Sequence, residues 1–214
     1  MDGEDTKMEL MWKGGERRIP NNYAGYSALS NSCVAKRLDF VLPFVKRGQK
    51  ILDLGCGVGW NTKFISLYCA KIYGLDINKE AIDYARKFND AVNVEWIVNP
   101  MHGLSMFSDS SVDLIISIAS IEHIDPDEMR KLIDEAYRIL KPKTLMLGTS
   151  APFGKKIILN ATAWHKCELS FTAFREIVNK KFEVKELMNF DLDTPEVRKN
   201  IKEGYFVLQS RKEK

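Results

Sequence analysis

The sequence lacks a long hydrophobic run. The longest candidate, residues 114–121, has eight residues, and two of them are serines. Because a helix that spans a membrane needs roughly 20 apolar residues, the sequence predicts no such helix. The first ten residues, MDGEDTKMEL, are acidic and contain no apolar segment, so no secretory signal is expected and the predicted location is the cytoplasm.

Cysteine and net charge are also sparse. The four cysteines form no CxxC pair and no metal-finger spacing, which favours reduced, mostly buried thiols. The formal net charge is only +3. Residues 198–214 contain six basic and two acidic residues, a net charge of +4, so the rest of the chain is close to neutral. A basic tail alone is weak support for a nucleic-acid partner, and none is expected.

The chain has 214 residues, of which 45% are hydrophobic and 29% charged, as is typical of one globular domain. Residues 1–33 are polar and weakly periodic, and residues 32–46 predict a helix that leads into the first strand. We therefore expect a cover or lid with a lead-in helix at 1–46, and the main domain at 47–214.

Short apolar runs alternate with amphipathic stretches from residue 49 onward. A helix start is marked most clearly at Asp125, a predicted N-cap that precedes Pro126 and stands three residues before Glu128. The alternation predicts a doubly wound, Rossmann-like α/β fold with a parallel sheet. Strands are expected at 50–54, 71–76, 93–98, 112–118 and, after a turn at Pro142, before residue 150; helices are expected at 60–69, 79–88 and after 125.

The pattern changes after the fifth strand. An irregular stretch to about residue 170 precedes a helix that carries Phe174, and the runs 182–190 and 203–210 follow without a clear helix between them. We expect these two runs to form an antiparallel pair at the sheet edge.

Three glycines follow the first strand, at positions 55, 57 and 59 of the segment ILDLGCGVGWNT. Glycine allows a tight turn and a close approach of the backbone to a ligand. Asp76, at the end of the second strand, stands where a carboxylate can accept hydrogen bonds from both hydroxyls of a ribose. Together these features predict an adenosine-containing cofactor across the carboxyl ends of the first two strands.

Two residues discriminate among such cofactors. The dinucleotide fingerprint GxGxxG needs a small residue at position 60, where this sequence has Trp60. Asp53 would place a carboxylate beside a site meant for pyrophosphate, whereas a cationic ligand would be stabilised by it. S-adenosylmethionine has a sulfonium, an ammonium and no phosphate, so it is the cofactor that the loop favours.

The segments ILDLGCGVG, YGLDIN, VDLIISIASIEHI and RILKPKTLMLGTS resemble the successive motifs of class I S-adenosylmethionine-dependent methyltransferases, over roughly residues 45–150. GERRIP, IEHI and AWHKCELSFTAFREIV look more loosely like the methyltransferases of glycan and polysaccharide biosynthesis. The family resemblance implies a sheet of seven strands, mostly parallel with an antiparallel C-terminal strand. It also implies that S-adenosylmethionine binds to the domain at 47–214 and leaves as S-adenosylhomocysteine.

The resemblance also implies a set of cofactor-binding residues. Pro100 replaces the acidic residue with which the family often binds adenine. Adenine recognition is therefore assigned to backbone groups near Met101 and His102, or to Asn99. The residues expected at the cofactor are Asp53, Gly55, Cys56, Gly57, Asp76, Ile77, Met101, His102 and Ser117.

The catalytic candidates are Glu122, His123 and His165. For His123 the two interpretations are a general base and a histidine that packs at the start of the next helix. Glu122 is expected to bond local backbone amides or to position the cofactor, and His165 is expected at the acceptor site by resemblance. Some related enzymes bind a divalent metal through a glutamate three residues before the EH pair; Ala119 stands there, so no metal site is expected.

The predicted function is methyl transfer to oxygen of a small molecule or glycan precursor. One alternative is an RNA or protein methyltransferase, which the absence of an NPPY-type motif and of a separate RNA-binding module disfavours. Another is a binding protein that keeps the cofactor fold without catalysis. The sequence does not indicate an oligomeric state.

Overall fold

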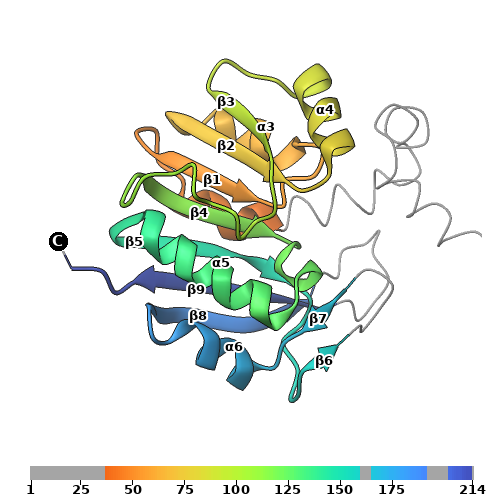
Figure 1. Ribbon diagram of the computed structural model, residues 1–214, viewed down its shortest axis with the longest axis vertical. Coiled ribbons are helices and arrows are strands. Elements are labelled where there is room, and N and C mark those ends of the chain that lie inside the picture. The colour runs from red at the N-terminus through yellow and green to blue at the C-terminus, as the bar shows by residue number, and fades with distance from the viewer. Residues whose placement is uncertain (1–36, 160–164, 192–201, 214) are drawn as a thin grey trace, which may run out of the picture.

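The computed structural model describes residues 37–159, 165–191 and 202–213 (Figure 1). Within them one sheet of seven strands has the order β3-β2-β1-β4-β5-β9-β8. This is the α/β architecture that the sequence predicted. The strands of this sheet are β1 (Lys50–Leu54), β2 (Lys71–Asp76), β3 (Val94–Val98), β4 (Val112–Ile118), β5 (Leu140–Ser150), β8 (Phe182–Asp191) and β9 (Lys202–Ser210).

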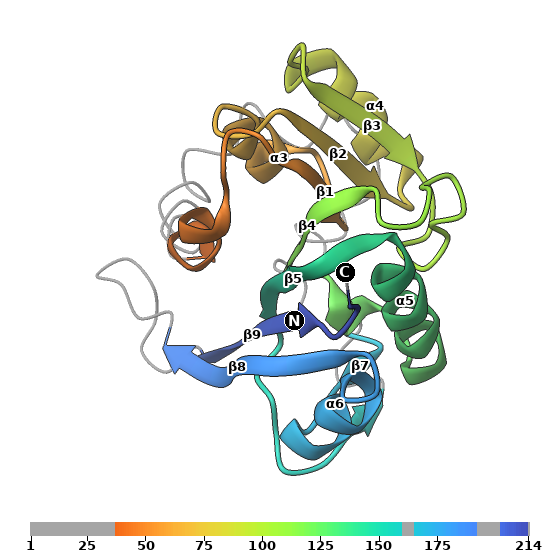
Figure 2. The ribbon, with the colours of Figure 1, turned by 90° about the vertical axis from the view of Figure 1, so that its left-hand side faces the viewer.

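The helices cover both faces of the sheet (Figure 2). One face packs against α5 and α6 through a large apolar cluster that includes Leu132 and Phe174. The other packs against α3 and the helical residues 37–41, through a cluster that includes Val41 and Ile65. The helical elements are η2 (Leu42–Phe44), α3 (Trp60–Ser66), α4 (Lys79–Phe88), η3 (Ile121–His123), α5 (Pro126–Ile139) and α6 (Phe171–Val178).

The strand order reverses beside β1. This strand pairs in parallel with β2 on one side and with β4 on the other, so Leu54 lies between Leu75 and Ser117. A reversal of this kind leaves a crevice at the carboxyl ends of the strands, and ligands of open α/β sheets bind there. The fold therefore places the ends of β1, β2 and β4 around one site.

Helix α5 begins as predicted. The side chain of Asp125 accepts hydrogen bonds from the backbone N–H groups of Asp127 and Glu128, and the Glu128 carboxylate accepts one from the Asp125 N–H. This capping box satisfies the first free donors of the helix. It also fixes the short connection between β4 and α5, which carries the histidine and glutamate expected in catalysis.

Helix α3 is shorter than predicted, since it ends at Ser66 and not at residue 69. The side-chain amide of Asn93 donates to the carbonyls of Ser66, at 2.8 Å, and Cys69, at 3.1 Å. These hydrogen bonds satisfy carbonyls that would have accepted backbone N–H groups if the helix had continued. The chain can therefore leave the helix early and enter β2 at Lys71.

The C-terminal half forms the expected antiparallel pair. Strand β9 is antiparallel to both β5 and β8, which puts β8 at the sheet edge. The stretch interpreted as irregular contains a two-stranded hairpin, β6 (Ile158–Leu159) with β7 (Cys167–Glu168). This hairpin lies beyond the end of the sheet toward which β5 points (Figure 1). Two-residue strands have no periodicity that a sequence could show.

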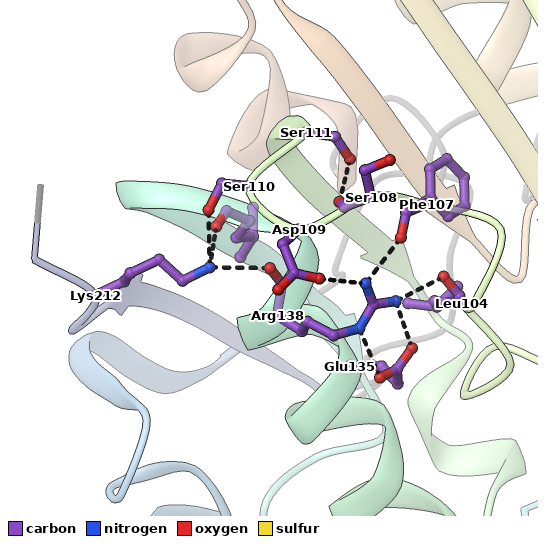
Figure 3. A network of polar contacts seen from close by, with 10 residues as sticks. Leu104, Phe107, Ser108, Asp109, Ser110, Ser111, Glu135, Arg138 and Lys212 are labelled. Atoms are coloured by element: carbon purple, nitrogen blue, oxygen red, sulfur yellow. Dashed lines mark hydrogen bonds and ion pairs between the residues drawn. The ribbon is translucent and has the colours of Figure 1, made fainter.

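Arg138 of α5 anchors the connection between β3 and β4 (Figure 3). Its guanidinium donates to the carbonyls of Leu104, at 3.0 Å, and Phe107, at 2.8 Å, and it pairs with the carboxylates of Asp109 and Glu135. A planar guanidinium has five donors, so one side chain can hold several loop carbonyls. The residues just after β3 are thereby fixed against the rest of the domain.

No helix in the described part of the chain is long and apolar enough to cross a membrane. The expected cover at 1–46 lies outside the described residues except for 37–46, and its proposed boundary stays a prediction.

Candidate functional site

A cavity of about 350 Å³ opens at the carboxyl ends of β1, β2 and β4. Pockets that bind small molecules are commonly about 300–1,000 Å³. Five of the residues expected at the cofactor line the cavity, together with the catalytic candidate His123. The five are Gly55, Asp76, Ile77, Met101 and His102.

Gly55 forms part of the cavity floor. Its φ is +69°, and a Cβ atom built on it would lie 2.4 Å from the Cβ of Ser120 and 3.4 Å from the Cε of Met101. The N–H groups of Gly55 and Cys56 both donate to the carbonyl of Leu75, at 2.8 and 3.0 Å. A residue with a side chain would be strained here and would crowd its neighbours, so the tight turn accounts for this glycine.

Asp76 is 6% exposed and is held by the backbone. One carboxylate oxygen accepts from the N–H of Gly57 and the other from the N–H of Asn78, both at 2.8 Å. Burial raises the pKa of this carboxyl, and the two backbone donors oppose that rise. The carboxylate is therefore fixed in orientation at the cavity wall, with lone pairs left for a ligand's hydroxyls.

Asp53 does not line the cavity. It is 2% exposed, and its carboxylate accepts a hydrogen bond of 2.6 Å from the hydroxyl of Thr62 on α3. Burial raises its pKa to about 7. This geometry favours support of the glycine loop over the direct contact with a cationic ligand that the sequence suggested.

Cys56, Gly57 and Ser117 also lie behind the cavity wall. The thiol of Cys56 faces the carbonyl of Gly57, at 3.6 Å, and Gly57 uses its N–H on Asp76. Ser117 is fully buried, with its hydroxyl 2.5 Å from that of Ser120. The described arrangement thus gives these residues contacts that shape the loop and floor.

The wall expected to meet adenine is a turn after β3. The N–H of Gly103 donates to the carbonyl of Pro100 at 2.9 Å, and the Asn99 side-chain amide donates to the carbonyl of Gly103. Met101 and His102 are therefore presented by the turn itself. The imidazole Nδ1 of His102 is buried and has no hydrogen-bond partner within the described structure.

The three catalytic candidates meet around η3. His123 lines the cavity, and its ring lies edge-on to that of His165, with centroids 5.5 Å apart. Glu122 is 4% exposed, and its Oε2 finds no hydrogen-bond partner in the described ranges. Burial raises the pKa of Glu122, and the proximity of the two histidines opposes the rise.

Glu168 completes this group and was not expected from the sequence. Its Oε1 lies 2.8 Å from Nδ1 of His165. The contact depends on the bend at Lys166 between the two residues, which no periodic pattern marks. At the cavity rim, the ammonium of Lys166 pairs with the carboxylate of Glu128 at 3.3 Å.

The residues at this cavity fit S-adenosylmethionine. The floor is a cradle that a Cβ at Gly55 would fill, the wall carries an anchored carboxylate at Asp76, and Ile77 and Met101 supply apolar surface. In residues 37–159, 165–191 and 202–213, no group of three or more His, Cys, Asp or Glu side chains is arranged to hold a metal ion. The expected absence of a metal remains a prediction.

Comparison with known proteins gives similarities over the same region. Residues 51–143 match a family model described as a methyltransferase domain. The chain is 35% identical over 108 residues to 24-methylenesterol C-methyltransferase 2 of Arabidopsis thaliana, covering 49% of this chain and 29% of that protein. It is 30% identical over 129 residues to the small RNA 2'-O-methyltransferase of Mus musculus, covering 53% and 33% respectively. The chain thus spans about a third of the length of these relatives.

The fold is similar to that of a solved S-adenosylmethionine-dependent methyltransferase from Methanosarcina mazei. The TM-score is 0.64 at 22% sequence identity, and the similarity covers 79% of this chain and 96% of the other. At this identity the likeness concerns the fold alone. The matched domain model, the strand order and the shared architecture agree with the motifs of the sequence: residues 51–143 match a methyltransferase domain, and the chain has the fold of a solved S-adenosylmethionine-dependent methyltransferase.

Proposed function

We propose that this chain binds S-adenosylmethionine in the cavity and transfers its methyl group to a hydroxyl of a small molecule or glycan precursor. The observation that carries the proposal is the position of His123: its imidazole lines the same cavity as Asp76. A carboxylate suited to a ribose and a side chain suited to proton removal thus line one cavity.

Bound S-adenosylmethionine supplies an electrophilic methyl group. Asp76 would accept hydrogen bonds from the ribose hydroxyls, and Gly55 would let the backbone lie close to the methionine part. Ile77 and Met101 would offer apolar surface to the adenine. Such contacts would orient the methyl group toward the acceptor, and alignment of this kind accounts for much of the rate.

A hydroxyl acceptor must lose its proton as its oxygen gains a methyl group. In the proposed reaction His123 takes that proton and becomes an imidazolium, which then releases the proton to solvent. A neutral imidazole has one ring nitrogen without a proton, and this nitrogen can accept the proton of the hydroxyl. His165 and Glu122 stand beside His123 and stabilise the positive charge.

The relatives bear on the acceptor. One is named for methylation of a sterol and another for methylation of RNA, so they do not support the expectation that a nucleic-acid partner is disfavoured. We favour a small acceptor because the residues that line the cavity beside His123 are the Lys166–Glu128 ion pair and Ile124, which together offer one polar and one apolar contact. The proposed compartment is the cytoplasm, in keeping with the unpaired thiols of the described cysteines.

The first test is calorimetry with S-adenosylhomocysteine, followed by methyl-transfer assays with hydroxyl-bearing sugar nucleotides and, separately, with total RNA. We expect micromolar cofactor binding and turnover on the small acceptors. His123→Gln should lower turnover about 100-fold, the usual contribution of a general base, and leave the cofactor Kd within twofold. Asp134→Asn, on an exposed ion pair with Lys181, is the control and should change neither.

Three outcomes would contradict the proposal in different ways. Lack of cofactor binding would exclude both enzyme interpretations. Binding without turnover on any acceptor would favour the non-catalytic alternative. Turnover on RNA that falls steeply with salt would favour a nucleic-acid methyltransferase.

A further inference from the structure

The pair formed by His165 and Glu168 is a second titratable group next to the cavity. The Nδ1 of His165 and the Oε1 of Glu168 are 2.8 Å apart, and the two side chains are 28% and 21% exposed. An ionised carboxylate can only accept hydrogen bonds, so the imidazole donates from Nδ1. In the neutral ring this leaves Nε2 as the acceptor, which fixes one tautomer of His165.

The same histidine contacts the proposed base. The ring planes of His123 and His165 are inclined by 70°, with centroids 5.5 Å apart, so one ring presents its edge to the other. His123 lines the cavity and His165 does not. Glu168, His165 and His123 therefore form a row that runs from the partly exposed β7 to the cavity wall.

This order suits a base that becomes positively charged. When His123 takes a proton, a charge of +1 appears at the cavity wall. In a neutral His165 the Nδ1–H is bound to the carboxylate, so the negative end of the ring dipole lies at Nε2. The carboxylate adds a full negative charge on the Nδ1 side of the ring. An aligned carboxylate and imidazole serve in this way in other enzymes that move protons.

We infer that Glu168 is a positioning residue for the His123 base and acts through His165, whose tautomer and orientation it fixes. This inference rests on the proposed function, because it assigns Glu168 a role in the proton removal proposed there. Other charged groups also face the histidines: Glu122 of η3, Asp76 of β2, and the Lys166–Glu128 pair at the cavity rim. The test therefore has to isolate the effect of Glu168 on His123 that is transmitted through His165.

A double-mutant cycle isolates that effect. The four proteins are the unmodified chain, Glu168→Gln, His165→Phe and the double variant, each saturated with S-adenosylhomocysteine and labelled with ¹⁵N. Long-range ¹H–¹⁵N NMR spectra report the tautomer of His165 and the pH at which His123 titrates. Asp134→Asn is the control for the loss of an exposed carboxylate of an ion pair.

In the unmodified chain we expect His165 as the Nδ1–H tautomer. Glu168→Gln should mix the two tautomers and lower the titration midpoint of His123 by on the order of half a pH unit. In the His165→Phe background the same substitution should leave the His123 midpoint unchanged. With the best small acceptor of the screen, Glu168→Gln should lower kcat about 10-fold and leave KM for S-adenosylmethionine unchanged, and Glu168→Asp should restore part of the loss.

Two results would overturn the inference. An unchanged His123 midpoint in Glu168→Gln would show that the carboxylate does not reach the base. An equal shift with and without the His165 ring would show that Glu168 acts independently of His165. The NMR measurements need no acceptor, so they are distinct from a failure of the proposed function, which would appear as absence of methyl transfer by the unmodified chain.

Discussion

Asp76 and Glu122 are both buried carboxylates at the same end of the sheet, and they are held in different ways. Both oxygens of Asp76 accept backbone N–H groups. Glu122 keeps one oxygen without a hydrogen-bond partner in the described part of the chain, and its neighbours are two histidine side chains. The carboxylate at the proposed cofactor end of the cavity is thus fixed by main chain, and the one at the proposed acceptor end lies among side chains.

This difference has a physical consequence. Backbone donors are placed by the strands and by the glycine loop, so they survive most side-chain changes. Contacts such as His123 with His165 depend on each partner's identity and orientation. Substitutions at the two proposed ends should therefore have different effects. Those at the cofactor end should change ligand affinity, and those at the acceptor end should change turnover.

The largest effect is expected at the backbone-held carboxylate. Asp76→Ala removes the acceptor for two ribose hydroxyls and leaves the N–H groups of Gly57 and Asn78 without their partner. Two hydrogen bonds to a charged group correspond to a loss of affinity of about 100-fold. Calorimetry with S-adenosylhomocysteine measures it, and Asp83→Ala on the exposed face of α4 is the control. A loss below fivefold would mean that the ribose binds elsewhere.

A second prediction concerns Asp53, a carboxylate on the cofactor side that makes no contact with the cavity. Its pKa is about 7 when folded, against 3.8 ordinarily, so the folded protein keeps a proton that the unfolded chain releases. The stability from this group is present in full below about pH 3.8 and is lost as the pH rises through about 7.

Asp53→Asn removes that dependence, because an amide carries no charge and its oxygen still accepts from the hydroxyl of Thr62. We expect the variant to be more stable than the unmodified chain by on the order of 4 kcal/mol at pH 8, and by little at pH 4. Thermal unfolding at the two pH values measures this, with Asp83→Asn as the control. A gain in stability of equal size at the two pH values would show that the effect comes from packing and not from the charge of Asp53.

The sequence predicted the cofactor half more completely than the acceptor half. Strands β1, β2 and β4 have the predicted bounds, because each is a buried apolar run that ends at a turn or a polar residue. Gly55 and Asp76 could be placed at the strand ends, where they line the cavity, because a tight turn and a strand-end carboxylate have a spacing that the sequence shows directly.

The acceptor half depends on contacts between segments that lie far apart in the chain. Glu168 meets His165 only through a bend, and the hairpin that carries it has strands of two residues. The sequence also does not indicate which residue of the EH pair faces the cavity and which faces the core. In the structure His123 lines the cavity, and Glu122 is buried. Side-chain orientation in a single helical turn is decided by tertiary packing.

The glycine loop gives a smaller effect than Asp76. Gly55→Ala places a Cβ 2.4 Å from that of Ser120 at a φ of +69°, so the loop must shift away from the ligand. We expect about 10-fold weaker binding of S-adenosylhomocysteine and a lower melting temperature. Gly48→Ala is a matched control, because a Cβ there would meet nothing within 4 Å. Equal effects at the two positions would exclude the cradle at Gly55.

The smallest effect concerns a cavity-lining side chain that the main chain does not hold. The imidazole of His102 lines the cavity, and its Nδ1 has no partner in the described structure. A half-turn of the ring would exchange Nδ1 with a carbon and allow the nitrogen to accept from the adenine amino group. His102→Phe should then weaken S-adenosylhomocysteine binding about fivefold, the value of one neutral hydrogen bond.

An analogue of S-adenosylhomocysteine that lacks the amino group separates hydrogen bonding from packing. It should bind equally well to His102→Phe and to the unmodified chain, and Met101→Leu in the same turn should leave the preference between the two ligands intact. If His102→Phe weakens both ligands alike, the ring acts by packing. Adenine would then be recognised by backbone groups of the turn.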